Sequence, residues 1–446
     1  MLCRQFLNNA HPVELTQKRR TSGPGGLSTK RRRLSLPELG QTPNQAVMPP
    51  RDDWSVQSIT ENCRPVHDTM GDAAFRELVL TELDRIITQG TPKTRGELNN
   101  QRMHSLLSQA RQPVTAGSEI EAYYLTGEEA EVHLKPDAIL HGPIITENQQ
   151  QFRWDQHNGQ PMEQLFRRMG NLDKTVWVQK PSLSLQEQSC VKMRFGDVRD
   201  IFLRNEISED PLNVLELRSP LPRSILPNFL TGEDCQLLGR VRDAVLDSDS
   251  MGRCAASVEE WNQWREVEEW VLLAQGGAQT LLHQDSCGRA TWLTVQQGQL
   301  GFGWISRPTE KEKSRWSADP LNYTGTKLRY VILNPGQTTY FEPGTIHFVF
   351  RHPMHQTVML GGHVLRWSRV DSWMEIVLNQ LRFPNTTNED VLPTAAVYVE
   401  TVAKLVLDRE QQGSAEELGG KTAIEKFFRL KKQFEQELRR HMSMTP

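Results

Sequence analysis

Two histidines and one aspartate have the types and spacing of a metal-binding set. His283 and Asp285 are separated by one residue in LLHQDSCG, and His347 follows a Pro-Gly turn in FEPGTIHFVF. Alternate residues of a strand face the same side, so His283 and Asp285 can offer a nitrogen and an oxygen to one ion. The turn places His347 at the start of another strand, opposite the first. A structural polar cluster is the alternative, because a lone His-x-Asp arises by chance in a chain with 12 histidines.

The chemistry of this set is that of a facial triad. Two imidazoles and one carboxylate leave open positions on a bound metal, an arrangement that suits non-haem Fe(II). Closed zinc sites usually take four protein ligands, often cysteines. The six cysteines of this chain are scattered and contain no Cys-x-x-Cys pair. The pattern therefore predicts an iron ion held by His283, Asp285 and His347.

Strands must position these residues, and residues 174–384 carry a strand-like pattern. Short runs rich in Val, Leu and aromatic residues are broken there by Pro and Gly. Many short strands with intervening turns indicate a sandwich or barrel, and about four or five of them fit between Asp285 and His347, enough to close a small barrel. The expected strands are 175–181, 191–196, 212–220, 270–275, 290–297, 300–306, 327–343, 346–352 and 357–365.

Helices are expected on both sides of the strands. Residues 72–89 place apolar side chains on one helical face, with Asp72 as a cap, and a second helix follows at 97–112. Residues 111–170 give no clear pattern. We divide the chain into a tail at 1–70, a helical region at 71–173, the β domain at 174–384 and C-terminal helices at 385–446. Further helices are expected at 231–246, with Thr231 as N-cap, and at 257–267, 388–407 and 422–442.

The first 70 residues are polar and rich in Pro and Gly, which predicts a disordered tail. Basic clusters at Lys18–Arg20 and Lys30–Arg33 are joined by a flexible linker, so both can occupy acidic grooves of one import carrier. This pattern resembles a bipartite nuclear signal and predicts a nuclear location. Weak direct contact with nucleic acid is the alternative.

The composition favours an intracellular protein. The formal net charge is −3, too close to neutral for the whole chain to be attracted to nucleic acid. No apolar run approaches the roughly 18 residues that span a bilayer. The scattered cysteines fit a reducing compartment, and the N-terminus lacks the apolar core of a signal peptide. We therefore expect no membrane segment.

Two longer segments carry a resemblance to a known family. GGAQTLLHQDSCGRATWLTVQQG at 276–298 and LNPGQTTYFEPGTIHFVF at 333–350 resemble the JmjC-domain proteins, a branch of the cupin-fold Fe(II)/2-oxoglutarate oxygenases. The resemblance covers about residues 174–370 and implies a mainly β fold, a double-stranded β-helix with flanking helices. It also implies that His283, Asp285 and His347 bind iron, and that Thr280 contacts 2-oxoglutarate as cosubstrate.

The implied activity is oxidation of a nuclear protein substrate, for example demethylation of a lysine in a histone tail. The sequence departs from the family at two positions. Leu300 stands where the family has a lysine that pairs with the distal carboxylate of 2-oxoglutarate, and Leu293 replaces an aromatic hydroxyl. Two other functions therefore stay open, a non-catalytic chromatin-associated scaffold and a protein or RNA hydroxylase. The bases that could replace the lysine are Lys192, Arg194, Lys327, Arg329 and Arg351.

Other polar and aromatic residues have simpler interpretations. We expect His352, His355 and His363 to be surface or core residues rather than a second metal site. Cys287 is expected to be small and buried. An aromatic cage for methylated lysine is the alternative to core packing for Trp261, Trp264, Trp270, Trp292 and Trp304, and core packing is preferred.

Overall fold

In the computed structural model, most of the residues that follow residue 69 are described. The structure describes residues 70–87, 94–136, 138, 140–183, 190–221, 225–246, 268–323, 325–387 and 392–444. These residues belong to one compact unit. The predicted nuclear signal within 1–70 and the helix predicted at 257–267 lie outside the described residues.

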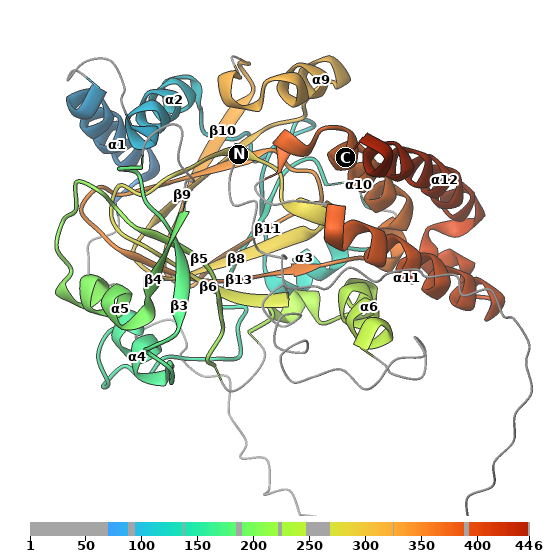
Figure 1. Cartoon of the computed structure of the whole chain (residues 1–446), viewed down its shortest axis with the longest axis horizontal. Coiled ribbons are helices and arrows are strands. Elements are labelled where there is room, and N and C mark those ends of the chain that lie inside the picture. The colour runs from blue at the N-terminus through green and yellow to red at the C-terminus, as the bar shows by residue number, and fades with distance from the viewer. Residues whose placement is uncertain are drawn as a thin grey trace, which may run out of the picture. The chain divides into compact units, whose positions relative to one another are not determined.

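The strands of the described residues form two sheets (Figure 1). The larger sheet has nine strands and the smaller has four, and every pairing is antiparallel except that of the first two strands. The order in the larger sheet is β1 (Tyr123–Tyr124), β2 (Ile144–Glu147), β11 (Gln337–Phe341), β8 (Ala290–Gln297), β13 (Thr357–Val364), β6 (Glu269–Ala274), β5 (Asn213–Arg218), β3 (Thr175–Gln179) and β4 (Cys190–Arg194). The order in the smaller sheet is β10 (Leu328–Leu333), β9 (Leu300–Ile305), β12 (His347–Arg351) and β7 (Thr280–His283). The short strands predicted between residues 174 and 384 are confirmed.

Strand β12 shows how alternation divides the interior. Val349 belongs to an apolar core that combines side chains of both sheets, and it shares its strand face with His347. Phe348 and Phe350 point to the other side, into a separate core beneath two helices. Each fully buried Phe or Val contributes about 1.5–3 kcal/mol to stability relative to an exposed one. The two-residue period of the sequence thus decides which side chains face the space between the sheets.

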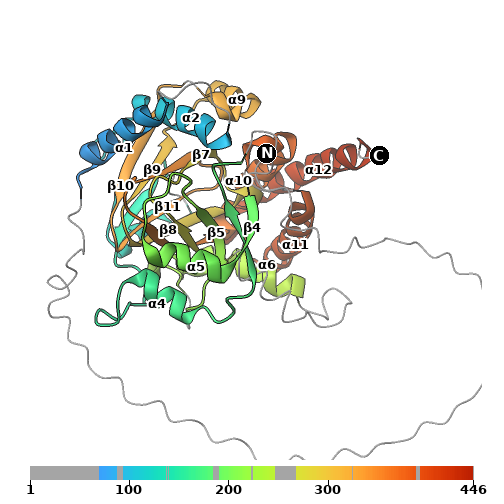
Figure 2. The ribbon, with the colours of Figure 1, turned by 60° about the vertical axis from the view of Figure 1, so that its left-hand side comes forward.

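Helices α1 (Asp72–Ile87) and α2 (Arg95–Gln109) cover the outer face of the four-stranded sheet (Figure 2). Both confirm the predicted helices at 72–89 and 97–112. Helix α2 begins with a capping box, in which the Thr94 hydroxyl accepts from the backbone of Glu97 and the Glu97 carboxylate accepts from the backbone of Thr94. The Asp72 carboxylate accepts a hydrogen bond of 3.3 Å from the backbone N–H of Ile332 in β10, which ties α1 to the sheet.

The segment at 111–170, which the sequence left unassigned, contributes to the larger sheet. Its strand β2 pairs with β11, and β1 pairs with β2 in parallel. The region 71–173 therefore provides strands as well as the predicted helices, because four residues with two buried isoleucines suffice for an added strand. Helices α3 (Gly127–His133), α4 (Pro161–Arg168) and α5 (Phe195–Arg204) pack with the core on the outer face of this sheet.

One mid-chain helix and three C-terminal helices surround a fourth apolar core. They are α6 (Leu237–Leu246), α10 (Val370–Arg382), α11 (Leu392–Gln411) and α12 (Gly420–Met444), and the last three lie together beside the sheets (Figure 1). Helices α11 and α12 confirm the predictions at 388–407 and 422–442. Helix α10 was not predicted, because its apolar residues follow β13 with no separating Gly or Pro.

Two further differences concern helix starts. The prediction of Thr231 as an N-cap is wrong, because the Thr231 hydroxyl donates to the carbonyl of Asn228 at 2.8 Å and α6 begins only at Leu237. Helix α9 (Glu310–Ala318) was missed although Thr309 and Glu312 form a capping box at its start. Within the described residues, no helix combines the length and apolar character needed to cross a membrane.

Candidate metal centre

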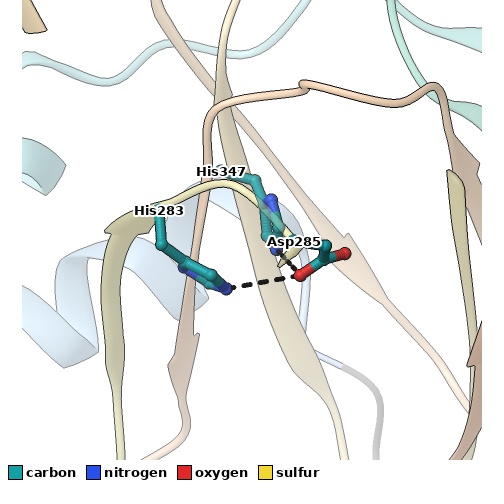
Figure 3. Close-up of side chains that lie close together, drawn as sticks. All are labelled: His283, Asp285 and His347. Carbon is teal, nitrogen blue, oxygen red and sulfur yellow. Dashed lines mark ion pairs between the residues drawn. The ribbon is translucent and has the colours of Figure 1, made fainter. Parts of the chain in front are cut away.

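The structure brings His283, Asp285 and His347 together (Figure 3). His283 ends β7 and His347 begins β12, and the two are direct partners in the antiparallel ladder. One ligand atom from each of the three residues lies within 4.8 Å of the others. Oδ1 of Asp285 is 3.7 Å from Nε2 of each histidine. Asp285 itself lies two residues beyond the end of β7, where the backbone stays extended, so it follows the strand rather than belonging to it.

Backbone carbonyls fix the orientation of both imidazoles. Nδ1 of His283 is 2.8 Å from the carbonyl oxygen of Leu281, and Nδ1 of His347 is 3.0 Å from that of Thr345. A carbonyl only accepts, so each Nδ1 carries a proton and Nε2 is the nitrogen left to bind a metal. Metal-binding histidines are typically oriented in this way by a hydrogen bond at the other nitrogen. The two Nε2 atoms are thus on the side where Asp285 lies.

Hydrogen bonds also support the carboxylate of Asp285. The Thr291 hydroxyl donates to Oδ2 of Asp285, and its oxygen is 3.0 Å from Nδ1 of His363. Burial raises the pKa of Asp285, but nearby histidines, His347 foremost, and the bond from Thr291 outweigh it and lower the pKa to about 2. Asp285 is therefore ionised at neutral pH. The sequence did not indicate Thr291, and it indicated His363 only as a surface or core residue.

His347 is neutral at physiological pH. Burial, followed by repulsion from His283, lowers the pKa of His347 to about 4, although Asp285 opposes the shift. The ring packs against Phe341, with 4.6 Å between ring centroids, and stacks on Phe302 at 5.6 Å. A neutral imidazole at His347 and an ionised carboxylate at Asp285 are the protonation states that a divalent metal requires of such ligands.

Thr280 lies at the start of β7 and is half-buried. It pairs with Val349, two residues after His347, although it precedes His283 by three, so β7 contains one extra residue. A regular strand would place Thr280 and His283 on opposite faces. Because of the bulge, Thr280 pairs with Val349, which faces inward. Thr280 therefore lies on the same face as the triad.

Among the five bases considered from the sequence, Arg351 differs from the other four in its burial and its partners. It is 2% exposed and follows His347 by four residues on β12, so both face the space between the sheets. Its Nε donates to the Thr357 hydroxyl at 3.0 Å and its Nη1 donates to the Ala278 carbonyl at 3.2 Å. No carboxylate among the described residues pairs with it, and burial alone lowers the pKa of Arg351 to about 9.

The other four bases are occupied elsewhere. Lys192 lies over the ring of Trp177. Arg194 forms ion pairs with Asp173 and Asp197. Lys327 pairs with Glu312, and Arg329 pairs with Glu121. Arg351 is also the direct cross-strand partner of Leu300 in the β12–β9 ladder. The buried cation therefore lies next to the position at which the family resemblance leads one to expect a lysine.

The remaining candidates are core residues. Leu293 and Leu300 belong to the core between the sheets. Trp270, Trp292 and Trp304 are at most 4% exposed, which confirms core packing for these three, whereas Trp261 and Trp264 lie outside the described residues. Cys287 is buried against the C-terminal helices as expected.

A comparison of the chain with models of known protein families finds no match, and a search of curated proteins finds none either.

Proposed function

We propose that this protein is an Fe(II)- and 2-oxoglutarate-dependent oxygenase that acts on a protein substrate in the nucleus. The two sheets would then be those of a double-stranded β-helix of the JmjC kind. The observation that carries the proposal is the convergence of His283, Asp285 and His347, with both Nε2 atoms and an ionised carboxylate directed to one point. Two histidines and one carboxylate suit Fe(II) and leave positions for other ligands.

Arg351 supports 2-oxoglutarate as the cosubstrate. A buried guanidinium without an acidic partner costs several kcal/mol, and a bound carboxylate offsets that cost. Four residues of strand separate Arg351 from His347, on the order of 13 Å between their Cα atoms. A five-carbon dicarboxylate with one end at the metal would span this gap only if the Arg351 side chain extended toward it from Ala278 and Thr357. Arg351 would therefore take the part of the lysine that is absent at Leu300, from the neighbouring strand.

The residues of the site have separate tasks in this proposal. His283, Asp285 and His347 would hold the iron, while Thr291 keeps the Asp285 carboxylate in place. Arg351 would bind the distal carboxylate of the cosubstrate, with the Thr280 hydroxyl on the same face. Iron with 2-oxoglutarate and O₂ supplies oxidation of an unactivated C–H bond. The buried aromatic wall of Phe302 and Phe341 would exclude water from this reaction.

The competing proposal is a non-catalytic scaffold, which Leu293 and Leu300 favour because both replace polar residues of the family pattern. Purified full-length protein incubated with Fe(II), 2-oxoglutarate and O₂ separates the two. We expect release of succinate that disappears in His283→Ala. A wild-type protein that binds Fe(II) but neither binds millimolar 2-oxoglutarate nor releases succinate would establish the scaffold instead.

A further inference from the structure

A cleft of about 660 Å³ is linked to the candidate metal centre through one of its lining residues, His363. Arg218 at the end of β5 and His363 near the end of β13 line it, together with residues of α6. Nδ1 of His363 is 3.0 Å from the Thr291 hydroxyl, which in turn donates to Asp285. Two hydrogen bonds therefore connect the wall of the cleft to the triad.

Positive charge dominates the cleft. Its cationic lining residues are Arg168, Lys174, Arg218 and Arg242. Of its two carboxylates, Glu268 is paired with Arg242 at 2.5 Å. Within the described part of the chain, no carboxylate forms an ion pair with Arg168, Lys174 or Arg218. This concentration of cations in a chain of net charge −3 is a local feature that attracts an anionic ligand.

The uncharged lining narrows the choice of anion. Met169, Leu221 and Leu226 are among the apolar lining residues, and none of the described lining residues is Phe, Tyr or Trp. Nucleic-acid bases held singly are typically stacked on aromatic side chains. A methylated lysine is typically held in an aromatic cage. The described lining offers neither surface, and its charge repels a basic histone tail.

We propose that this cleft binds an acidic peptide segment, and that the substrate of the neighbouring site is a protein with aspartate or glutamate residues beside the oxidised position. Arginine forks bind carboxylates through two parallel hydrogen bonds, which suits Arg168 and Arg218. An extended peptide advances about 3.3 Å per residue. In the proposal, residues that flank an anchored acidic side chain would extend toward the triad, to which the cleft wall is linked through His363 and Thr291. As a statement about substrate, the inference rests on the proposed oxygenase function.

The test is binding of labelled peptides to the full-length chain, measured by fluorescence anisotropy. The probes are an acidic peptide, the same peptide with Lys at each acidic position, the same peptide with Gln and Asn there, and a single-stranded oligonucleotide. We expect only the acidic peptide to bind tightly. Lys174→Gln combined with Arg218→Gln should weaken that binding by about tenfold or more. Added salt should weaken it as well.

The matched control is Lys313→Gln combined with Arg315→Gln, which removes the same two charges from exposed positions of α9, neither of which lines the cleft. It should leave the affinity within about twofold of the wild type. The proposal is overturned if both double variants lose affinity equally, since charge alone would then explain binding. It is also overturned if the cleft variant retains affinity, as it would if Lys30–Arg33 bound the peptide, or if the oligonucleotide binds as tightly as the acidic peptide.

The same assay separates this proposal from the oxygenase proposal. His283→Ala should bind the acidic peptide normally while it loses succinate release. Peptide binding without succinate release in the wild type would remove the oxygenase and leave the docking site. Succinate release without selective binding of the acidic peptide would remove only the docking site.

Discussion

The two ends of strand β12 carry buried polar groups with opposite requirements. At its first residue, His347 faces an ionised carboxylate and a second imidazole, so this end lacks positive charge. At its last residue, Arg351 is buried with a hydroxyl and a carbonyl as its named partners, so that end lacks negative charge. Both residues face the space between the sheets, about four residues apart.

This difference fits the proposed binding of a metal ion and a carboxylate in the interior. A fold optimised for stability alone would pair Arg351 with an acid or replace it with an apolar residue, because an unpaired buried charge is costly. A cation bound at the His347 end and a carboxylate bound at the Arg351 end would supply the charge that each end lacks. Variants of one end that leave the other intact therefore test whether the two ends bind separate groups.

The largest effect is expected from His283→Ala, which removes one of the three ligands. Substitution of a residue that only supports a ligand costs about 10- to 100-fold in metal affinity, so loss of a ligand should cost more. In wild-type protein, Mn(II) at 100 times its dissociation constant should raise the free energy of unfolding by about 2.7 kcal/mol. The corresponding rise in Tm should be absent in His283→Ala. An equal rise in both proteins would place the ion elsewhere.

Arg351→Met should separate binding from stability. We expect the affinity for 2-oxoglutarate to fall by about 100-fold or more, while Mn(II) affinity stays within a few-fold of the wild type. Removal of an unpaired buried charge should leave the free energy of unfolding unchanged or raise it by about 1–4 kcal/mol. Calorimetric titration and thermal unfolding measure the two quantities. A less stable variant with normal 2-oxoglutarate binding would show that Arg351 is structural.

Thr291→Val tests the support of the metal end with little change in shape. The hydroxyl that donates to Asp285 is lost, so metal affinity should fall by about 10- to 100-fold. The 2-oxoglutarate end should be affected only through the metal. Serine at the same position keeps the hydroxyl, so Thr291→Ser should restore most of the Mn(II) affinity. Failure of Thr291→Ser to do so would assign the effect to packing.

The smallest effect on binding is expected from the outward face of the same strand. Phe350 packs under α1 and α2, adjacent in sequence to Arg351. Phe350→Leu should lower the free energy of unfolding by about 1–2 kcal/mol. The Mn(II) and 2-oxoglutarate affinities should each stay within about twofold of the wild type. A large loss of either would contradict the division of β12 into an outward structural face and an inward functional one.

The sequence predicts the strands and the three residues that meet between them because both depend on local patterns. His283 and Asp285 follow a strand and His347 follows a turn, and two-residue alternation marks the strands that carry them. Even spacing from His347 also places Arg351 on the inward face, a signal that would have separated it from the other bases. Exclusion of those bases requires their ion pairs, which join distant segments such as Glu121 and Arg329.

What the sequence could not supply is register. Thr291 and His363 support Asp285 because β8 and β13 pair in the register that makes these two residues direct partners. Leu300 and Arg351 are neighbours for the same reason, through β9 and β12. Many registers are compatible with equally apolar strands, so such pairs become visible only in the folded sheet. The basic cleft depends on the same folding, since α4, β5 and α6 contribute its cations.

The central claim is that one metal ion is held by His283 at the end of β7, Asp285 two residues beyond it and His347 at the start of β12. Equilibrium dialysis of Fe(II) under anaerobic conditions tests it most directly, with the wild type and His347→Ala compared at equal concentration. We predict one tightly bound ion per wild-type chain and none in His347→Ala, with both proteins folded by circular dichroism. Tight binding of one ion by the folded His347→Ala protein would contradict the assignment of the metal centre.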